Sequence, residues 1–513
     1  MQFKIDKGTW LKLAIFATGI SGFTSEFILS TLASYFIGDT IIQWTVVLSI
    51  MLFAMGVGSR LSRFVTKDLL ATFIAVEFAL SLLISFSPLV VYSLASATNF
   101  IHILIYGLAL LIGVCIGFEI PLVTRLNEKH ESLDKNISNI MSWDYIGSLI
   151  GGLSFAFFGL PYLGITNTAF AFGALNFTVA VLLYWNYKSY YPQLKKWVYS
   201  VSFFISLLLM VGFSLSEKVV LFGEQSRYKD KIVYTEQTPY QKITITQWKE
   251  HYWLFINGNQ QLSTFDEFLY HEPMVHPVVA LTPEHKDVLI IGGGDGFNVK
   301  ELLKYEDVDQ ITLVDLDPAM TRIGMDFKGL TQYNDSALFN PKVAILNQDG
   351  FKYLEQCETY FDLIIVDLPD AKSIDLNKLY TQEFYQMAYR LLRPNGHIIT
   401  QAGSPYYATK AFKCIETTMS SSGFHTLPMH NQVLTLGEWG WIIGSKRLTK
   451  DKMIDIMRQS DYSYLNNKWL NRESIQLITS FGKPLFDTSK VEVNTINSPV
   501  LYRYYLDGNW DLY

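Results

Sequence analysis

Residues 288–296 read Val-Leu-Ile-Ile-Gly-Gly-Gly-Asp-Gly, and they carry the main signal for the fold of the second half of the chain. Four consecutive apolar residues predict a short strand that is buried on both faces, as in a parallel sheet. The glycines that follow allow a tight turn and a close approach to a ligand, and residues 299–305 continue with a helical pattern. A glycine loop alone is a weak signal, because many nucleotide-binding folds use one.

Strand and helix patterns continue to alternate after this loop. We expect a helix over 382–393, and strands at 310–314, 343–346, 361–366 and 397–401. This order is typical of a doubly wound, Rossmann-like α/β sheet. A different pattern precedes it. Residues 242–263 alternate like a β-hairpin or meander, with Asn257-Gly258 as a tight turn.

Four aspartates follow successive predicted strands: Asp295, Asp315, Asp349 and Asp367. Ligands of doubly wound sheets bind beyond the carboxyl ends of the strands. A single aspartate at such a place is usually a helix cap or a turn residue. Four of them at four strand ends predict a binding site.

The charge of Asp295 limits the classes of ligand that this site can bind. A helix N-terminus normally favours a phosphate, but Asp295 places a carboxylate there. It would repel a pyrophosphate or the carboxylate of S-adenosylmethionine, and it would attract an ammonium group. Asp315 follows twenty residues later, a spacing suited to ribose hydroxyls. These features argue against NAD and for a cationic nucleoside.

The first half of the chain has the composition of a membrane domain. A bilayer core requires about 20 apolar residues per helix. Seven such stretches are found, at about 10–35, 42–62, 69–96, 99–124, 142–162, 165–187 and 196–216. Backbone groups in lipid must bond internally, so we expect helices here.

Acidic residues lie within or at the ends of these stretches: Glu26, Glu77, Glu119 and Asp144. Ionisable groups in a membrane are costly and usually face the interior of a bundle. One interpretation is a path or site for a cation. The other is that the acids pair with Arg60 or Arg125, or reach the membrane interface.

Basic residues follow the second, fourth and sixth stretches: Arg60, Arg63, Lys67, Arg125, Lys135, Lys188, Lys195 and Lys196. The positive-inside rule then places the N-terminus in the cytoplasm, and seven crossings would leave the second half outside. The net charge of −6 gives no footprint for nucleic acid. The three cysteines have no metal-ligand spacing, and we expect no metal.

Several motifs together resemble the spermidine-synthase (polyamine aminopropyltransferase) family, over residues 228–445. The matching pieces are Pro239-Tyr-Gln241, Asn257-Gly-Asn-Gln-Gln261, Asp266-Glu-Phe-Leu-Tyr-His-Glu272, the loop 292–296, Leu313-Val-Asp-Leu-Asp-Pro318, Asp349-Gly350, Asp367-Leu-Pro-Asp370, Leu379-Tyr-Thr-Gln-Glu-Phe-Tyr385 and Gln401-Ala-Gly-Ser-Pro405. The apolar helices and the tail from Val491 resemble those of bacterial members with a membrane domain. The resulting domains are a transmembrane region at 1–216, a β domain at 228–282, a Rossmann-like catalytic domain at 283–450 and a C-terminal extension at 451–513.

The resemblance implies transfer of an aminopropyl group from decarboxylated S-adenosylmethionine, a co-substrate, to putrescine or a related polyamine. No other cofactor is implied. Asp367 would be the general base, with Tyr270 and Asp370 holding the attacking amine. The donor would be bound by Gln241, Gln261, Gly292, Gly294, Asp295, Asp315, Asp349 and Gly350. Asp315 would take the ribose, Asp349 the adenine amino group and Asp295 the aminopropyl ammonium. We also expect a homo-oligomer in the cell membrane. The intracellular substrates favour a cytoplasmic catalytic domain, against the loop charges.

The chain departs from the family at the acceptor side. Soluble members usually have Asp-Ser-Ser-Asp where this chain has Asp367-Leu-Pro-Asp370. A tyrosine-containing segment is replaced by Gly437-Glu-Trp-Gly-Trp441. Trp439 could stack on an aliphatic diamine or simply belong to the core.

Two alternative functions stay open. A methyltransferase of the same fold usually has an acid just before the glycine loop, where this chain has Ile290-Ile291. A polyamine transporter or sensor would use the second half only to bind its ligand. Retention of Asp367, Asp370 and Tyr270 argues against such an inactive domain.

Overall fold

The computed structural model describes residues 7–38, 40–95, 100–128, 131–482 and 490–508. The outermost ends of the predicted membrane region and C-terminal extension, residues 1–6 and 509–513, lie outside these ranges. So do residues 96 and 99, at the edges of two predicted helices. The chain divides into two compact units, residues 1–231 and 232–513.

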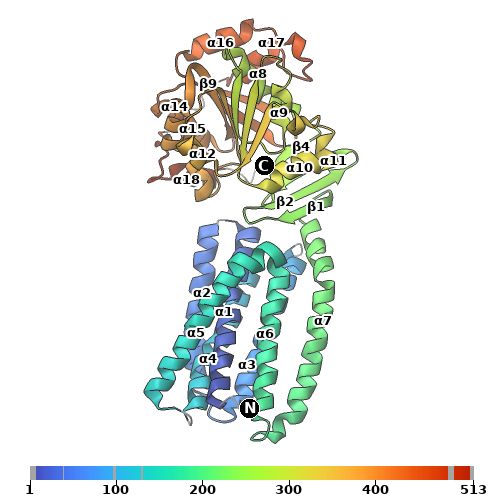
Figure 1. Ribbon diagram of the computed structural model, residues 1–513, viewed down its shortest axis with the longest axis vertical. Helices are drawn as coiled ribbons and strands as arrows, with labels where there is room; N and C mark the ends of the chain where they lie inside the picture. The colour runs from blue at the N-terminus through green and yellow to red at the C-terminus, as the bar shows by residue number, and fades with distance from the viewer. Residues whose placement is uncertain (1–6, 39, 96–99, 129–130, 483–489, 509–513) are drawn as a thin grey trace. The chain divides into compact units, whose positions relative to one another are not determined.

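Long helices make up the first unit (Figure 1): α1 (Lys7–Ile37), α2 (Thr40–Ser62), α3 (Leu69–Ala95), α4 (Ile101–Asn127), α5 (Leu133–Ser154), α6 (Gly164–Tyr187) and α7 (Lys195–Gln225). Within the described ranges, six helical segments are long and apolar enough to span a membrane. One of these, residues 133–187, comprises α5, a π-helical segment (Phe155–Leu163) and α6. At 55 residues it far exceeds the roughly 20 that one crossing needs. The chain bends at Gly164, whose φ is +72°.

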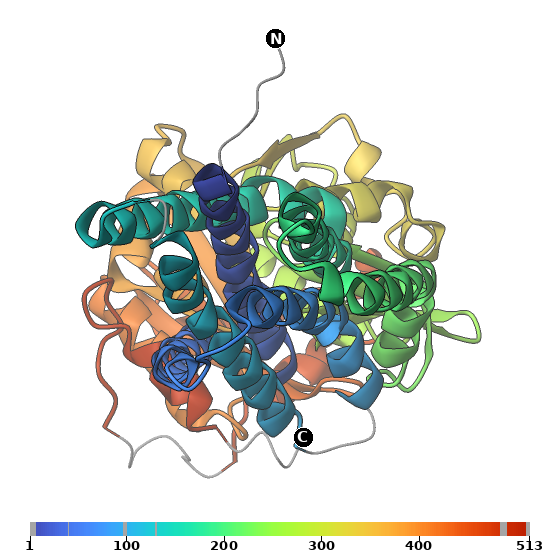
Figure 2. The same ribbon diagram turned by 90° about the horizontal axis from the view of Figure 1, so that it is seen from below.

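Glycines bring several of these helices into close contact. Figure 2 shows the ribbon of the chain from below. A Cβ on Gly147 would lie 2.2 Å from the carbonyl oxygen of Phe16, and one on Gly151 would lie 2.3 Å from that of Ile20. These successive contacts show that α5 runs parallel to α1. Close backbone packing of this kind stabilises helices in lipid, where the hydrophobic effect contributes little between them.

The second unit begins with a four-stranded antiparallel meander of β1 (Lys231–Gln237), β2 (Lys242–Trp248), β3 (His251–Ile256) and β4 (Asn259–Ser263). The predicted turn at Asn257-Gly258 joins β3 to β4, and both residues have positive φ, at 50° and 81°. Ile243, Ile245 and Leu254 are buried against α10 (Pro318–Asp326).

A seven-stranded sheet forms the centre of this unit, in the order β10-β11-β9-β8-β5-β6-β7. Its strands are β5 (Asp287–Gly292), β6 (Gln310–Asp315), β7 (Val343–Asn347), β8 (Phe361–Asp367), β9 (Leu392–Gly403), β10 (His425–Val433) and β11 (Gly437–Ser445). The five strands from β5 to β9 are parallel, and β10 and β11 add an antiparallel edge. The predicted α/β sheet is therefore confirmed, with this mixed edge.

Helices cover both faces of the sheet (Figure 1). One face packs on α8 (Phe268–Leu281) and α9 (Phe297–Leu302), and the other on α12 (Gly350–Gln356), α14 (Gln382–Leu391) and α15 (Thr409–Ser421). Strand β5 contributes Val288 and Ile290 to one core and Leu289 and Ile291 to the other. Burial on both faces explains why this strand is apolar without alternation.

The C-terminal residues also pack on this unit. Helices α16 (Lys450–Gln459) and α17 (Arg472–Ile478) join the core on the α8 face, and α18 (Val500–Leu506) joins the core on the α15 face. Tyr505 of α18 is fully buried. The tail therefore completes the hydrophobic core instead of lying apart from it.

Candidate active site

The chain order reverses between β5 and β8. From β5 the chain moves outward to β6 and β7, and it then returns to the other side of β5 to form β8. Such a switch point leaves a crevice at the carboxyl ends of the two strands, where doubly wound folds bind ligands. Gly292 pairs with Asp367 at this edge, and Asp315 pairs with Asn347 on the neighbouring strands.

The glycine loop fits closely against two of the predicted acids. A Cβ on Gly292 would lie 1.9 Å from the carbonyl oxygen of Asp367, and one on Gly294 would lie 2.6 Å from Oδ2 of Asp315. Gly292 also has a φ of +83°, which disfavours other residues. Larger side chains at these positions would displace the acids that we expect to bind ligand.

Asp367 is held by two hydrogen-bond donors. The Tyr270 hydroxyl donates to its Oδ1 at 2.8 Å, and Nδ2 of Asn298 donates to its Oδ2 at 2.6 Å. Burial raises the pKa of Asp367 to about 6, and the nearby charge of Asp295 acts in the same direction. The two hydrogen bonds and His271 act in the opposite direction. The result is an oriented carboxylate that can accept a proton near neutral pH.

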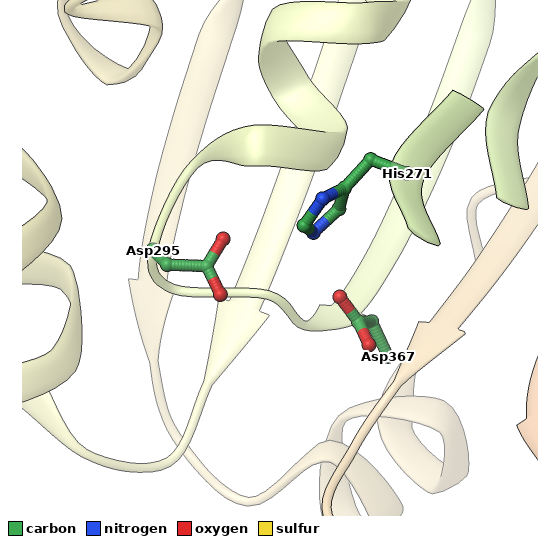
Figure 3. A group of neighbouring side chains, drawn as sticks. All are labelled: His271, Asp295 and Asp367. Atoms are coloured by element: carbon green, nitrogen blue, oxygen red, sulfur yellow. The ribbon is translucent and has the colours of Figure 1, made fainter. Parts of the chain in front are cut away.

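Asp295 and His271 complete a cluster with Asp367 (Figure 3). One ligand atom from each of the three lies within 4.8 Å of the others. His271 Nδ1 contacts the carbonyl oxygen of Glu267 at 2.8 Å, which leaves Nε2 for the cluster. Burial alone lowers the pKa of His271, but its contacts with Glu267, Asp295 and Asp367 outweigh burial and raise it.

This cluster has the donor types of a metal site, one imidazole and two carboxylates. The same arrangement can also bind ammonium groups, because each carboxylate can accept hydrogen bonds from them. The expectation that no metal is involved stays a prediction.

Asp315 lies at the end of β6 and accepts two backbone hydrogen bonds. Gly294 donates to Oδ2 at 3.1 Å, and Asp317 donates to Oδ1 at 2.9 Å. Burial raises the pKa of Asp315 to about 6 despite these bonds. The carboxylate is therefore fixed beside the glycine loop. Its predicted role in binding ribose stays a prediction.

Asp349 is the N-cap of α12 and forms an ion pair. It accepts from the backbone of Phe351 at 2.9 Å and from Nζ of Lys378 at 2.6 Å. Burial opposes ionisation, but the bond from Lys378 outweighs it and lowers the pKa of Asp349. Gly350 follows, and a Cβ there would lie 2.7 Å from the side chain of Ile291. Sequence reasoning did not foresee Lys378 as the partner of this acid.

Two other side chains contact the predicted acceptor acid Asp370. Its Oδ2 lies 3.3 Å from Nζ of Lys372, and the Tyr505 hydroxyl lies beside the same carboxylate. Tyr505 also lies within 2.7 Å of a Cβ placed on Gly403. A residue of the C-terminal tail therefore reaches the acid that we predict to bind the acceptor.

The two tryptophans of β11 lie two residues apart and so on the same side of the strand. The ring of Trp441 lies 5.3 Å from that of Tyr270, and Trp441 is fully buried. Trp439 is partly buried and packs against the core that includes Tyr270. The structure thus brings Trp441, rather than Trp439, into direct contact with the site.

The predicted glutamines lie on the meander. Gln261 belongs to β4, and its Nε2 donates to the carbonyl of Asn259 at 3.2 Å. Gln241 follows Thr238, whose hydroxyl donates to Asp317 Oδ2 at 2.8 Å. This bond joins the β1–β2 loop to the segment just after Asp315. No contact in the described part of the chain joins either glutamine side chain to the acids.

Two residues of the site were missed by sequence reasoning. His271 stands next to Tyr270 in the quoted motif but received no role, and Asn298 lies in α9 beyond the glycine loop. Asn298 is fully buried. Its place two residues after the glycine loop, at the start of the predicted helix, was the signal that the sequence offered.

Comparison with known proteins shows which family the chain belongs to. Residues 267–455 match the model of the spermine/spermidine synthase domain. The chain is 36% identical over 98% of its length to a polyamine aminopropyltransferase of Leptospira interrogans, covering 99% of that protein. It is 37% identical over 97% of its length to polyamine aminopropyltransferase 2 of Aquifex aeolicus, covering 98% of that protein.

A solved structure is also similar. It is a spermidine synthase in complex with the transition-state analogue AdoDATO, with 27% identity and a TM-score of 0.45. The match covers 49% of this chain and 85% of that one. From the full-length relatives, the chain belongs to the spermidine synthase family of polyamine aminopropyltransferases and is a transferase.

Proposed function

We propose that this protein transfers the aminopropyl group of decarboxylated S-adenosylmethionine to putrescine, or to a related diamine or polyamine. The products are spermidine, or the corresponding longer polyamine, and 5′-methylthioadenosine. The observation that supports this most is Asp367, a carboxylate oriented by Tyr270 and Asn298 beside Asp295. Family membership supports the same reaction class.

The chemistry requires a base and alignment. An alkyl ammonium with a pKa near that of lysine, about 10.4, is not a nucleophile until it loses a proton. Asp367 accepts that proton as the amine nitrogen attacks the aminopropyl carbon next to sulfur. The carbon–sulfur bond breaks, and its electron pair converts the sulfonium to a neutral thioether. Positioning of amine, carbon and sulfur in one line supplies much of the remaining rate.

Each acid binds a different group of the donor or the acceptor. Asp315 binds the ribose hydroxyls, Asp349 the adenine amino group and Asp295 the aminopropyl ammonium. Asp370 and Tyr270 hold the attacking amine of the acceptor, and Trp439 and Trp441 line its methylene chain. For Asp349 to bind adenine, its bond with Lys378 must loosen or be shared. The cluster of acids also raises the local concentration of a dication.

A methyltransferase on the same fold is the second candidate, but Asp295 disfavours it. This carboxylate lies in the glycine loop, where the carboxylate of S-adenosylmethionine would meet like charge. Decarboxylation of the donor removes that conflict. The donor choice therefore follows from one charged side chain.

Product analysis tests the proposal. Detergent-purified protein is given putrescine with decarboxylated S-adenosylmethionine, and separately with S-adenosylmethionine, and products are identified by mass spectrometry. We expect methylthioadenosine and spermidine in the first mixture only. S-adenosylhomocysteine in the second would indicate a methyltransferase, and no product in either would contradict both activities.

We further propose that the protein resides in the cell membrane with its catalytic unit in the cytoplasm, because the donor is an intracellular metabolite. The loop charges favour the opposite side. Cys357 is partly exposed in the catalytic unit, whereas Cys414 is buried. A membrane-impermeant maleimide should therefore label Cys357 in inverted vesicles but not in intact cells, and labelling of intact cells would reverse the orientation.

A further inference from the structure

We propose that the N-terminal unit contains a second amine site, in which Glu77 and Glu119 bind an ammonium group of a polyamine inside the helix bundle. The choice of an amine rests on the proposed function, because the attached catalytic unit acts on amines. The site itself is inferred from the contacts of the bundle.

Both carboxylates are enclosed by protein. Glu77 of α3 is fully buried, and Glu119 of α4 is 1% exposed. The two interact electrostatically, so they lie near each other. Among the described residues, neither oxygen of Glu77 has a hydrogen-bond partner, and nor does Oε1 of Glu119.

Two basic side chains of the same unit, Arg125 and Lys12, are bonded elsewhere. Arg125 donates to the carbonyl oxygens of Ser62 and Val65 at 2.8 and 2.7 Å. Lys12 pairs with Glu131. The predicted pairing of the acids with Arg125 is therefore not formed at Glu77 or Glu119.

A third buried polar side chain lies on α6, a helix that packs against α3. Asn176 is fully buried, and its Nδ2 has no hydrogen-bond partner in the described structure. The rings of Phe78 and Phe177 lie 5.9 Å apart, and a Cβ on Gly173 would meet the carbonyl of Ser81. Helices α3 and α6 are thus antiparallel, with Asn176 level with Glu77.

The amide can present either of its ends to this site. Its Oδ1 contacts the Ser21 hydroxyl, and that hydroxyl also lies 3.1 Å from the carbonyl of Thr18, to which it can donate. With Ser21 donating to the backbone, a flipped Asn176 would donate to Ser21 and turn its oxygen toward Glu77. The amide then adds an acceptor to the two carboxylates.

Hydroxyl groups extend the polar cluster along two other helices. Ser81 lies one turn from Glu77, is fully buried, and its Oγ has no partner among the described residues. Thr18 of α1 lies within hydrogen-bonding reach of Glu119. Four helices that pack together, α1, α3, α4 and α6, therefore each contribute a polar group.

These groups match the chemistry of an alkyl ammonium. Unpaired ionised carboxylates inside a bundle are costly, so a proton or a cation must balance them. An ammonium supplies one positive charge and three hydrogen-bond donors to acceptors that lack them. Its methylene chain suits the apolar core around Phe73, Phe78 and Leu122. An inorganic cation such as calcium would need about six to eight oxygen ligands.

Protection from a carboxyl reagent tests the site on the unmodified protein. Dicyclohexylcarbodiimide enters membranes and modifies protonated carboxyl groups, and mass spectrometry of peptides locates the adducts. Spermidine at about ten times its Kd leaves about one tenth of sites empty, so labelling of Glu77 and Glu119 should fall about tenfold. Glu217 of α7 is exposed and serves as the unprotected reference. If sodium chloride at matched ionic strength protected Glu77 and Glu119 equally well, the amine assignment would be overturned. If spermidine gave no protection, protons alone would balance the two carboxylates, and the proposal would also be overturned.

Binding stoichiometry tests the proposed amine site independently of the labelling experiment. Radiolabelled spermidine is titrated onto the full chain and onto the double variant Glu77→Gln, Glu119→Gln, with Glu217→Gln as the matched control. We expect the double variant to bind one equivalent fewer than the other two proteins. Equal stoichiometry in all three would overturn the proposal.

Methylthioadenosine formation is measured on the same preparations. It should be unchanged in the double variant, which also shows that this protein is folded. Loss of product in every preparation would contradict the proposed function. The binding stoichiometry would still test the membrane site, because it does not depend on turnover.

Discussion

The hydroxyl of Tyr270 donates a hydrogen bond of 2.8 Å to Oδ1 of Asp367. The two residues are 97 positions apart, on α8 and at the end of β8. Burial raises the pKa of Asp367 to about 6, and this hydrogen bond limits the rise. The tyrosine therefore helps to orient the proposed base and keeps its pKa from rising further.

Removal of this hydroxyl should slow the reaction and move its pH dependence. A hydrogen bond to a charged group contributes about 1.5–3 kcal/mol, so Tyr270→Phe should lower kcat by about tenfold or more. Because the bond stabilises the ionised form, its loss raises the pKa of Asp367, and the acid limb of kcat moves to higher pH. Tyr360→Phe, at an exposed tyrosine, is the control. An acid limb that does not move would show that Tyr270 has no influence on the pKa of the base.

Loss of the base itself should be more severe. Asp367→Asn keeps the shape but cannot accept the proton, and kcat should fall by about 10²–10⁴. Affinity for the donor, measured by calorimetry with decarboxylated S-adenosylmethionine, should change little. Asp309→Asn, at an exposed aspartate of the same unit, should have full activity. Near-normal turnover of Asp367→Asn would assign the base to another group.

The wild-type protein should lose activity as the pH falls through about 6. Burial, as the main cause, raises the pKa values of both Asp367 and Asp315 to about 6. A base or a ribose-binding acid is active only when ionised, so activity is present above this pH and lost below it. The profiles of kcat and kcat/KM from pH 5 to 8 check this. A kcat that stays constant down to pH 5 would show that no carboxylate with this pKa acts as the base.

The glycine loop should not accept even one methyl group at position 294. A Cβ there would lie 2.6 Å from Oδ2 of Asp315, so Gly294→Ala must displace this carboxylate. We expect KM for the donor to rise by about tenfold, equivalent to about 1.4 kcal/mol, with a smaller effect on kcat. Gly107→Ala, where a Cβ meets nothing within 4 Å, is the control. An unchanged KM for the donor would show that Asp315 does not bind the donor.

A buried ion pair should make the stability of the catalytic unit depend on pH. Burial alone raises the pKa of Glu301, but the hydrogen bond from His276 and the charge of Lys304 outweigh it and lower the pKa to about 2. This stabilisation is present above the ordinary value of 4.5 and is lost as the pH falls toward 2. Glu301→Gln should therefore lower the free energy of unfolding at pH 7 by about 3 kcal/mol.

Urea unfolding followed by intrinsic fluorescence measures this change. The exposed Glu306→Gln provides the control. Equal midpoints for the two variants at pH 7 would show that the Glu301 pair contributes nothing to stability.

Sequence patterns predicted much of the fold because they are local. Apolar runs such as 288–291 predict buried strands, and the glycines after them predict the turn that follows. In a parallel sheet the carboxyl ends of all strands meet at one edge, so Asp295, Asp315 and Asp367 were expected to lie close together. The register confirms the placement of Asp315 and Asp367 at that edge.

Sequence patterns alone thus predicted the α/β architecture, the apolar helices and the acids at the sheet edge. The partners of those acids became visible in the three-dimensional structure: Tyr270 and Asn298 on Asp367, Lys378 on Asp349, and Tyr505 beside Asp370. It also decided that Asn176 lies level with Glu77. Secondary structure depends on short-range periodicity, which a sequence displays directly. Side-chain partners depend on how distant elements pack, and spacing along the chain does not record that.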